Sequence, residues 1–208
     1  MGEIDLKWLW VCGWGVSPKA LKSWATEAFP GISHQVILPL RLPQGFHDGF
    51  DKILGWSWGG YRVLEWFVTS ENRQKAPPIV LFSPFFGFCL EDSQGGKTSR
   101  THVKYLARWM KRDPVAALTD FYQRAGLTFP FCALDQECFL FWTNELSHLA
   151  NEKLDINQVI GAIETTNMQI FVGEKDPLVD APYLVEKLGA IMVPKVGHDL
   201  AALAYFMK

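Results

Sequence analysis

Short runs of apolar, β-branched and aromatic residues alternate along the chain with longer stretches in which apolar residues recur at helical spacing. Gly, Pro or Ser follows each short run within two residues, as expected where a strand passes into a loop. This alternation predicts an α/β protein built on a mainly parallel sheet. The six predicted strands are Leu6–Val11, Gln35–Leu38, Lys52–Leu54, Ile79–Phe82, Met168–Val172 and Ala190–Val193.

One interval, residues 89–154, interrupts the alternation because it contains successive helix patterns with no predicted strand between them. Its second helix has clear ends, since Asp113 can cap it, Pro114 suits its first position and Gly126 can end it. We interpret the interval as a helical lid over the C-terminal edge of the sheet, where open α/β sheets bind ligands. The predicted organisation is a single domain with a core of residues 1–88 and 155–208 and a lid of residues 89–154.

The composition is that of a compact globular domain, with 208 residues of which 49% are hydrophobic and 20% charged. This apolar content excludes a disordered chain. A balance of 20 Lys and Arg against 22 Asp and Glu gives a net charge of −2, which does not favour nucleic-acid binding. The N-terminal segment is acidic where a signal peptide would be basic, and no apolar run has the roughly 20 residues needed to cross a bilayer. We therefore expect a soluble, cytoplasmic monomer that binds neither nucleic acid nor membrane.

The four cysteines, Cys12, Cys89, Cys132 and Cys138, form no Cys-x-x-Cys pair and have no histidine at metal-ligand spacing. A core of this size needs no disulfide bonds, so we expect reduced and mostly buried thiols. The sequence predicts neither a metal site nor a bound cofactor.

The strongest chemical signal is the segment Gly55-Trp56-Ser57-Trp58-Gly59-Gly60, which follows a predicted strand and precedes a helix pattern. It contains the Gly-x-Ser-x-Gly motif of the turn that presents a nucleophilic serine at the head of a helix. Glycines are needed because side chains two positions before and after the serine would collide with neighbouring backbone. The alternative is a glycine-rich turn in which Ser57 has no chemical role.

A nucleophilic serine needs a base and an acid, which follow it along the chain in proteins with this turn. Asp176 lies in the loop after the fifth predicted strand, and His198 lies in the loop after the sixth. Both loops leave the C-terminal edge of the sheet, so His198 can accept the proton of Ser57 while Asp176 holds its other ring nitrogen. Asp180 and Glu174 are the alternative acids, since each lies within about one turn of Asp176.

The other four histidines do not follow the C-terminal end of a predicted strand. We expect His34 at the surface before a strand, His47 in a polar loop, and His102 and His148 on lid helices. None of these positions favours a catalytic base.

The negative charge that develops on an ester oxygen during attack needs two backbone N–H donors. One is the amide of Trp58, after the serine, and the second comes from a loop after an earlier strand. The segment Cys12-Gly13-Trp14-Gly15 follows the first predicted strand and offers the N–H of Trp14. An ordinary glycine-rich exit from a strand is the alternative interpretation of this segment.

Together these motifs resemble the α/β-hydrolase superfamily over nearly the whole chain. Within it, Gly-Trp-Gly paired with Gly-Trp-Ser-x-Gly-Gly is similar to the pimeloyl-[acyl-carrier protein] methyl ester esterases of biotin synthesis, which carry HGWG and GWSLGG. The resemblance implies a carboxylesterase that hydrolyses the methyl ester of a carrier-bound acyl chain. It also implies a triad of Ser57, Asp176 and His198, with the amides of Trp14 and Trp58 as oxyanion donors.

Three features depart from the longer members of that family. Cys12 occupies the position of the usual histidine, and the stretch between Leu38 and Lys52 is too short for a full crossover helix. The first predicted strand already precedes the oxyanion loop, without the antiparallel strands that usually come before it. These features resemble the compact variants of this esterase.

A basic segment, residues 95–112, contains six basic and no acidic residues. If the whole segment is helical, these residues fall within about one third of the helix circumference. Such a stripe on the lid would attract an acidic acyl-carrier protein and direct its prosthetic arm toward Ser57. A solvated helix face without a partner is the alternative. The stripe consists of Lys97, Arg100, Lys104, Arg108, Lys111 and Arg112, of which the last five are the predicted carrier-binding residues.

The predicted function is therefore that of a serine esterase with an acyl-carrier protein as partner. The same residues could release a carrier thioester, or perform the lyase reaction of the related menaquinone-pathway enzymes. A non-catalytic binding module on this fold is a third alternative, which the complete set of triad residues disfavours.

Overall fold

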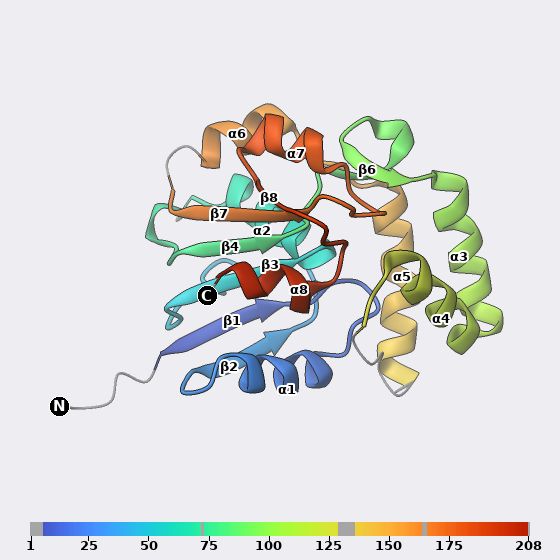
Figure 1. The fold of residues 1–208 in the computed structure, drawn as a ribbon, viewed down its shortest axis with the longest axis horizontal. Coiled ribbons are helices and arrows are strands. Elements are labelled where there is room, and N and C mark those ends of the chain that lie inside the picture. Colours follow the sequence, from blue (N-terminus) through green and yellow to red (C-terminus); the bar gives the residue numbers. More distant parts are fainter. Residues whose placement is uncertain (1–5, 72, 129–135, 164–165, 208) are drawn as a thin grey trace.

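The computed structural model describes residues 6–71, 73–128, 136–163 and 166–207. Its centre is a six-stranded sheet of order β2-β1-β3-β4-β7-β8, in which every neighbouring pair is parallel (Figure 1). The predicted α/β architecture is confirmed, and each predicted strand end lies within two residues of the observed one. The strands are β1 (Lys7–Val11), β2 (Ser33–Ile37), β3 (Lys52–Trp56), β4 (Ile79–Phe82), β7 (Met168–Gly173) and β8 (Ile191–Val193).

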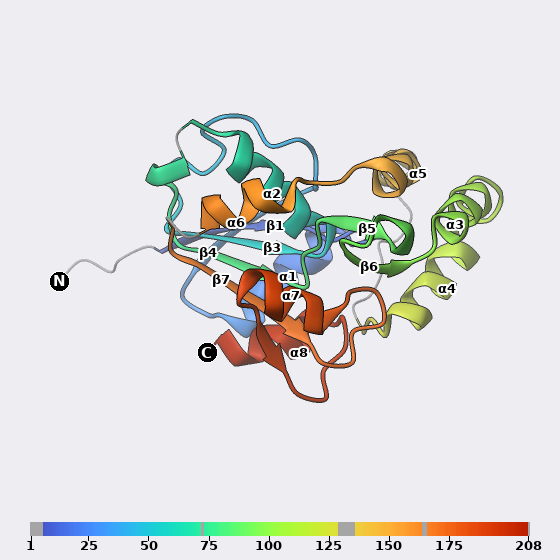
Figure 2. The same ribbon diagram turned by 90° about the horizontal axis from the view of Figure 1, so that it is seen from above.

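Helices enclose the sheet on both faces, as the view from above shows (Figure 2). One face carries α2 (Trp58–Thr69), α6 (Ile156–Ile163) and α7 (Ala181–Leu188). The opposite face carries α1 (Pro18–Ala28) and α8 (Leu200–Ala204). No helix connects β2 to β3 through residues 38–51, all of which are described, so the predicted short crossover is confirmed. Single 3₁₀ turns occur at Arg73–Lys75, Leu90–Asp92 and Tyr205–Met207.

The central strands are buried on both faces. In β4, Ile79 and Leu81 pack in the apolar cluster that includes α2, α6 and α7. Val80 and Phe82 pack in the second cluster, with α1 and α8. Because side chains alternate between two buried faces, the sequence of such a strand is a continuous apolar run and not an alternating one.

The lid helices lie together beyond the C-terminal ends of the strands, on the right of Figure 1. They are α3 (Arg100–Arg112), α4 (Pro114–Ala125) and α5 (Gln136–Asn151). The predicted ends of α4 are confirmed: the side chain of Asp113 accepts the N–H of Ala116 at 3.1 Å, and Gly126 adopts φ 66°.

The prediction that residues 89–154 contain no strand is wrong. A parallel two-stranded sheet, β5 (Gly87–Cys89) and β6 (Gly95–Thr98), lies between the main sheet and α3 (Figure 2). The sequence of β6 has no apolar run, and its Gly96 is required because a Cβ there would collide with the carbonyl of Phe88. Residues 95–112 are therefore not one helix: Lys97 lies in β6, and α3 begins only at Arg100.

The turn from β3 into α2 brings helix and sheet backbones into direct contact. A Cβ on Gly55 would lie 2.9 Å from the Cα of Gly60. A Cβ on Gly59 would overlap the carbonyl oxygens of Val11 and Cys12 at the end of β1. The predicted steric need for glycine on both sides of the serine is thus confirmed.

Replacing Gly59 by alanine should destabilise the fold strongly, because the added methyl meets backbone atoms that cannot rotate away. We expect the free energy of unfolding, measured by urea denaturation, to fall by at least about 1–3 kcal/mol, the usual cost of overpacking. Gly161→Ala is the matched control, since Gly161 lies in α6 with open space around its Cβ position. This change should raise the free energy of unfolding by about 0.5–1 kcal/mol. Equal effects of the two changes would contradict the steric role of Gly59.

Candidate active site

Ser57 occupies the turn between β3 and α2, as the N-cap residue of that helix. Its φ of 54° and ψ of −118° form a backbone conformation that residues with a side chain rarely adopt. The N–H of Ser57 donates to the carbonyl of Phe82 at 2.8 Å, which ties the turn to the end of β4. The strained turn projects the hydroxyl into a cavity under the lid.

His198 and Asp176 form a buried pair in the loops after β8 and β7. The distance from Nδ1 of His198 to Oδ2 of Asp176 is 2.7 Å, and both side chains are almost completely buried. Oδ1 of Asp176 accepts the N–H groups of Leu178 at 2.9 Å and Val179 at 3.0 Å. The carboxylate is therefore held by hydrogen bonds on both oxygens, and it fixes the orientation of the imidazole.

The environment of Asp176 favours its charged form. Burial by itself would raise the pKa of this carboxyl group, but the charge of His198 and the hydrogen bond to its ring outweigh burial. Together with the N–H of Leu178, they hold the pKa of Asp176 below its usual value. The site therefore contains a carboxylate that can stabilise an imidazolium.

The second ring nitrogen of His198 is available for proton transfer. Nε2 is buried and has no hydrogen-bond partner among the described residues. The ring packs against Trp56, the residue before the serine, with 6.0 Å between ring centroids, and the indole N–H of Trp56 donates to the carbonyl of His198 at 3.1 Å. A hydrogen bond between Ser57 and His198 is not formed in the described structure; such bonds are often long before substrate binds.

The two alternative acids make other contacts. Asp180 caps α7 by accepting the N–H of Tyr183 at 3.2 Å. Glu174 accepts the N–H of Lys195 at 2.8 Å at the surface. Asp176 is thus the carboxylate that the structure brings to His198.

The two residues predicted to supply oxyanion donors lie close to Ser57. Trp58 is the first residue of α2, so its N–H has no acceptor within the helix. The loop of Trp14 lies against the serine, since a Cβ on Gly13 would be 3.4 Å from the Cβ of Ser57. Both tryptophans line the same cavity as Ser57.

This cavity has a volume of about 360 Å³ and reaches from Ser57 to the inner faces of the lid helices. Most of its lining is apolar. The ionisable residues among the described lining are all basic or neutral: Lys97, His102 and Arg124. The apolar lining residues are Trp14, Trp58, Phe88, Leu90, Val103, Leu106, Phe121, Leu146, Leu149, Pro177 and Leu178. The site can therefore accept an acyl chain beside the serine.

Several side chains have surroundings that the sequence did not predict. His102 and Arg124 were not predicted to line a cavity, because helix periodicity does not say which neighbour a polar residue faces. His34 was expected at the surface, but it is buried within β2, where its Nδ1 accepts the indole N–H of Trp10 at 3.1 Å. A buried ionic pair, Arg62 and Glu145, also lies behind Trp58. The one signal for it was a charged residue, Arg62, at a buried position in the mostly apolar helix α2.

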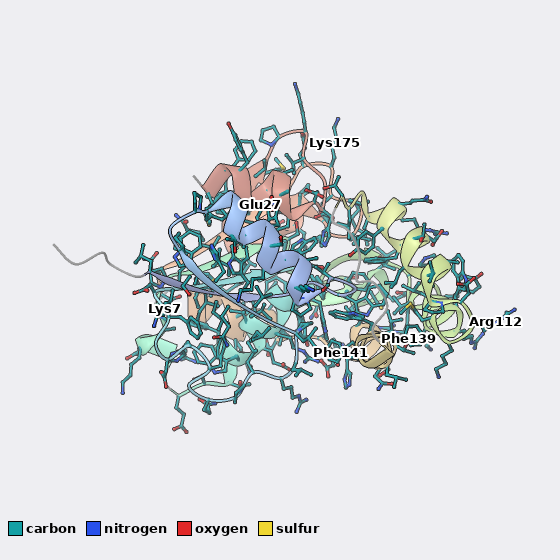
Figure 3. The ribbon with its side chains drawn as sticks, turned by 90° about the horizontal axis from the view of Figure 1, so that it is seen from below. Lys7, Glu27, Arg112, Phe139, Phe141 and Lys175 are labelled. Carbon is teal, nitrogen blue, oxygen red and sulfur yellow. The ribbon has the colours of Figure 1, made fainter. Side chains whose placement is uncertain are left out.

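The predicted basic stripe divides into parts with different surroundings. Lys104, Arg108 and Lys111 line an open groove of about 330 Å³ between α3 and α5. The opposite wall carries neutral polar side chains: Thr143, Asn144, Ser147 and Asn151. Arg112 projects from the outer end of the lid, far from Lys7 at the start of β1 (Figure 3).

Arg100 belongs to the interior contacts of the lid and not to this groove. Its guanidinium pairs with Asp92 at 2.7 Å and donates to the carbonyl of Ala150 at 2.8 Å. Lys97 donates to the backbone carbonyl of Asp176 at 2.7 Å. The prediction of one continuous stripe is therefore wrong, because a strand and these internal contacts remove its first two members.

Cys12 and Cys89 are buried, as predicted, whereas Cys132 and Cys138 lie outside the residues whose side chains are described. Burial raises the pKa of the Cys89 thiol to about 11, which keeps it protonated. In the described part of the chain, no three His, Cys, Asp or Glu side chains are placed to hold a metal ion. None of the helices described there combines the length and apolar character needed to span a membrane.

Neither a protein-family model nor a curated protein matches the chain by sequence. Among solved structures, an esterase from Exiguobacterium antarcticum is similar with a TM-score of 0.62 at 12% identity, over 93% of this chain and 85% of that one. A type II thioesterase of the yersiniabactin biosynthetic pathway gives 0.56 at 13% identity, over 98% and 90%. An α/β hydrolase from Novosphingobium aromaticivorans gives 0.52 at 11% identity, over 98% and 88%. The chain therefore has the α/β-hydrolase fold.

The depressed pKa of Asp176 predicts a specific pH dependence of stability. A carboxyl group with a folded-state pKa below its unfolded value of about 3.9 stabilises the fold above that pH, and this contribution is lost as the pH falls through the folded-state pKa. The difference in unfolding free energy between the wild type and Asp176→Asn should shrink as the pH falls below about 4. Urea denaturation from pH 7 to pH 2 measures it. A difference that grows toward low pH would contradict the assigned direction of the shift.

Proposed function

We propose that this protein is a serine carboxylesterase in which Ser57 is the nucleophile, His198 the general base and Asp176 the residue that orients it. The observation that carries the proposal is the strained serine turn at the floor of an apolar cavity, together with the 2.7 Å pair of His198 and Asp176 at the same sheet edge. In such a site a serine hydroxyl gains a nearby base that is itself held in the correct tautomer.

The reaction begins when Oγ of Ser57 attacks the ester carbonyl and its proton passes to Nε2 of His198. The charge of Asp176 stabilises the imidazolium, and the N–H groups of Trp14 and Trp58 stabilise the oxyanion of the tetrahedral intermediate. The ester C–O bond then breaks, and the leaving alcohol takes the proton from His198. A water molecule, activated by the same histidine, releases the acid from Ser57.

The proposed substrate is the methyl ester of pimeloyl-acyl-carrier protein in biotin synthesis. Three observations support it: the motifs around Trp14 and Ser57, the apolar cavity suited to an acyl chain, and the basic groove on the lid. We also propose that the protein acts in the cytoplasm as a monomer, with residues 89–154 forming the lid over a core of residues 1–88 and 155–208.

The partner in this proposal is the acyl-carrier protein that carries the substrate. Lys104, Arg108 and Lys111 line one wall of the groove between α3 and α5 and form no ion pair within 4.0 Å among the described residues. The N–H of Arg100 and, more weakly, the charge of Lys104 lower the pKa of Glu91. An acidic carrier would be attracted to this groove, beside the cavity that contains Ser57. We do not include Arg100 in the proposed carrier-binding surface, because its guanidinium pairs with Asp92 within the lid.

The second candidate is a thioesterase that releases acyl groups from a carrier. The structural similarity to a type II thioesterase favours it, although that similarity extends only to the fold at 13% identity. Turnover on free short esters, on pimeloyl-carrier methyl ester and on acyl-carrier thioesters separates the two candidates. A lyase of the menaquinone-pathway type would process none of these substrates, and a binding module would fail to react with a fluorophosphonate probe.

Ser57→Ala and His198→Ala should each abolish ester hydrolysis while leaving the protein folded. Losses in triads are of order 10⁶-fold, and the double variant should be no worse than either single one because the residues act as a unit. Turnover of a short p-nitrophenyl ester and circular dichroism spectra measure the two effects. More than about a hundredth of wild-type turnover in either variant would exclude the triad.

Substitutions of the three carboxylates that follow β7 test which of them orients His198. Asp176→Asn should lower kcat about 10⁴-fold because it favours the wrong tautomer of the imidazole. Asp180→Asn and Glu174→Gln should have little effect, since their side chains contact only backbone N–H groups at the surface.

Reversing Lys104 and Arg108 to Glu should lower kcat/KM for the carrier-bound ester and leave a small soluble ester unaffected. Two attractive contacts become repulsive, and exposed charges act mainly on the association rate. The effect should weaken with salt, since the Debye length falls from about 10 Å at 0.1 M to about 3 Å at 1 M. Steady-state kinetics at both ionic strengths measure it.

Lys19→Glu with Lys22→Glu is the matched control, because it changes the net charge equally on α1, which covers the core and not the lid. It should leave turnover of the carrier-bound ester unchanged. If the lid and α1 variants behave alike, the groove has no specific role and overall charge explains the effect.

A further inference from the structure

The indole of Trp58 is the most constrained side chain beside the nucleophile. It is fully buried, and its ring stacks on Tyr61 with 4.5 Å between centroids and 19° between planes. Its Nε1–H donates to Oε2 of Glu145 at 2.7 Å. Glu145 lies on α5, so this hydrogen bond joins the residue after Ser57 to the lid.

Arg62 holds the carboxylate that receives this hydrogen bond. Its guanidinium lies 4.3 Å from the centre of the Trp58 ring and donates through Nη2 to Oε2 of Glu145 at 3.4 Å. The same guanidinium pairs with Glu65 at 2.9 Å and with Glu152 at 2.8 Å. A buried guanidinium needs carboxylates to pair with it, because an unpaired charge is costly to bury.

The surroundings of Arg62 favour its charged form. Burial would lower the pKa of Arg62, but the nearby carboxylates Glu65, Glu152 and Glu145 outweigh burial and raise it. The guanidinium therefore stays charged although only 2% of Arg62 is exposed. Glu145 thus has a permanent cation on one side and the indole N–H on the other.

We propose that Glu145 is a positioning residue that fixes Trp58 and, through it, the backbone N–H that stabilises the oxyanion. The proposal rests on the function proposed above, in which Trp58 supplies one of two oxyanion donors. Without an acceptor, the indole would keep a buried donor unpaired, or rotate toward the cavity that Trp58 already lines. Either response acts on the first residue of α2, directly beside the reacting serine.

The experiment compares Glu145→Leu with Glu145→Gln, whose amide oxygen can still accept the indole hydrogen bond. Glu145→Leu should lower kcat for a short soluble ester about 10–100-fold, less than the 10²–10³-fold cost of losing an oxyanion donor outright. KM should change by less than about threefold, since the lost interaction acts on the transition state. Glu145→Gln should keep kcat within about threefold of the wild type, because it removes the charge and retains the acceptor.

A double variant separates positioning from general disruption of α5. Trp58→Phe combined with Glu145→Leu removes the indole donor and its acceptor together, so no indole N–H is left unpaired, while the lost contact of Arg62 with Glu145 is common to the single and double variants. Its kcat should exceed that of Glu145→Leu by at least about tenfold, the lower end of the loss that the single change causes. Inhibition by a trifluoromethyl ketone, which forms an oxyanion on Ser57, should weaken in parallel with kcat across the series.

Glu152→Gln is the matched control, since it removes another carboxylate from Arg62 without touching Trp58. It should leave kcat unchanged, with thermal unfolding recorded for every variant. The proposal is overturned if folded Glu145→Leu keeps wild-type kcat, if Glu145→Gln is equally damaged, or if the double variant recovers nothing. Should Glu145→Leu not fold, Glu145→Met tests the same loss of acceptor by the same criteria. A wild type that neither hydrolyses esters nor reacts with a fluorophosphonate at Ser57 would instead refute the proposed function.

Discussion

The site depends on one steric constraint, the direct contact between the first turn of α2 and the end of β1. At Gly59 no side chain fits, because a Cβ would overlap the carbonyl oxygens of Val11 and Cys12. This contact forces Ser57 into a backbone conformation of the kind that costs about 1–3 kcal/mol, and two buried faces of the sheet hold it there. It also brings the loop of Gly13 against the serine, so one packing constraint positions the proposed nucleophile and the proposed oxyanion donors together.

The lid is joined to the core next to both Ser57 and His198. Trp58, after Ser57, donates to Glu145 on α5 at 2.7 Å. Asp199, after His198, accepts the N–H of Thr128 at 2.9 Å and its hydroxyl at 2.6 Å, just beyond the end of α4. The lid helices therefore form walls of the site, and a shift of either attachment would act on the residue next to Ser57 or His198.

Charge and apolar surface are separated within the lid. Its inner side lines a cavity with mostly apolar residues around Ser57, whereas the groove between α3 and α5 presents Lys104, Arg108 and Lys111. An acyl chain suits the first surface and an acidic partner suits the second. This division is the basis of the proposed substrate, in which an apolar acyl chain enters the cavity and an acidic carrier docks on the groove. Because the cavity and the groove carry different side chains, the contribution of each to turnover can be measured independently.

The sequence by itself determined the parallel sheet, the serine turn and the order of Ser57, Asp176 and His198, because strands buried on both faces and tight glycine turns are local patterns. It did not determine β6, whose glycines carry no apolar signal, or the separation of Lys97 and Arg100 from the basic groove. The pairing of Glu145 with Trp58 joins residues 87 positions apart. Only the tertiary structure decided these features, since they depend on which side chains meet across the molecule and not on the spacing of residues along it.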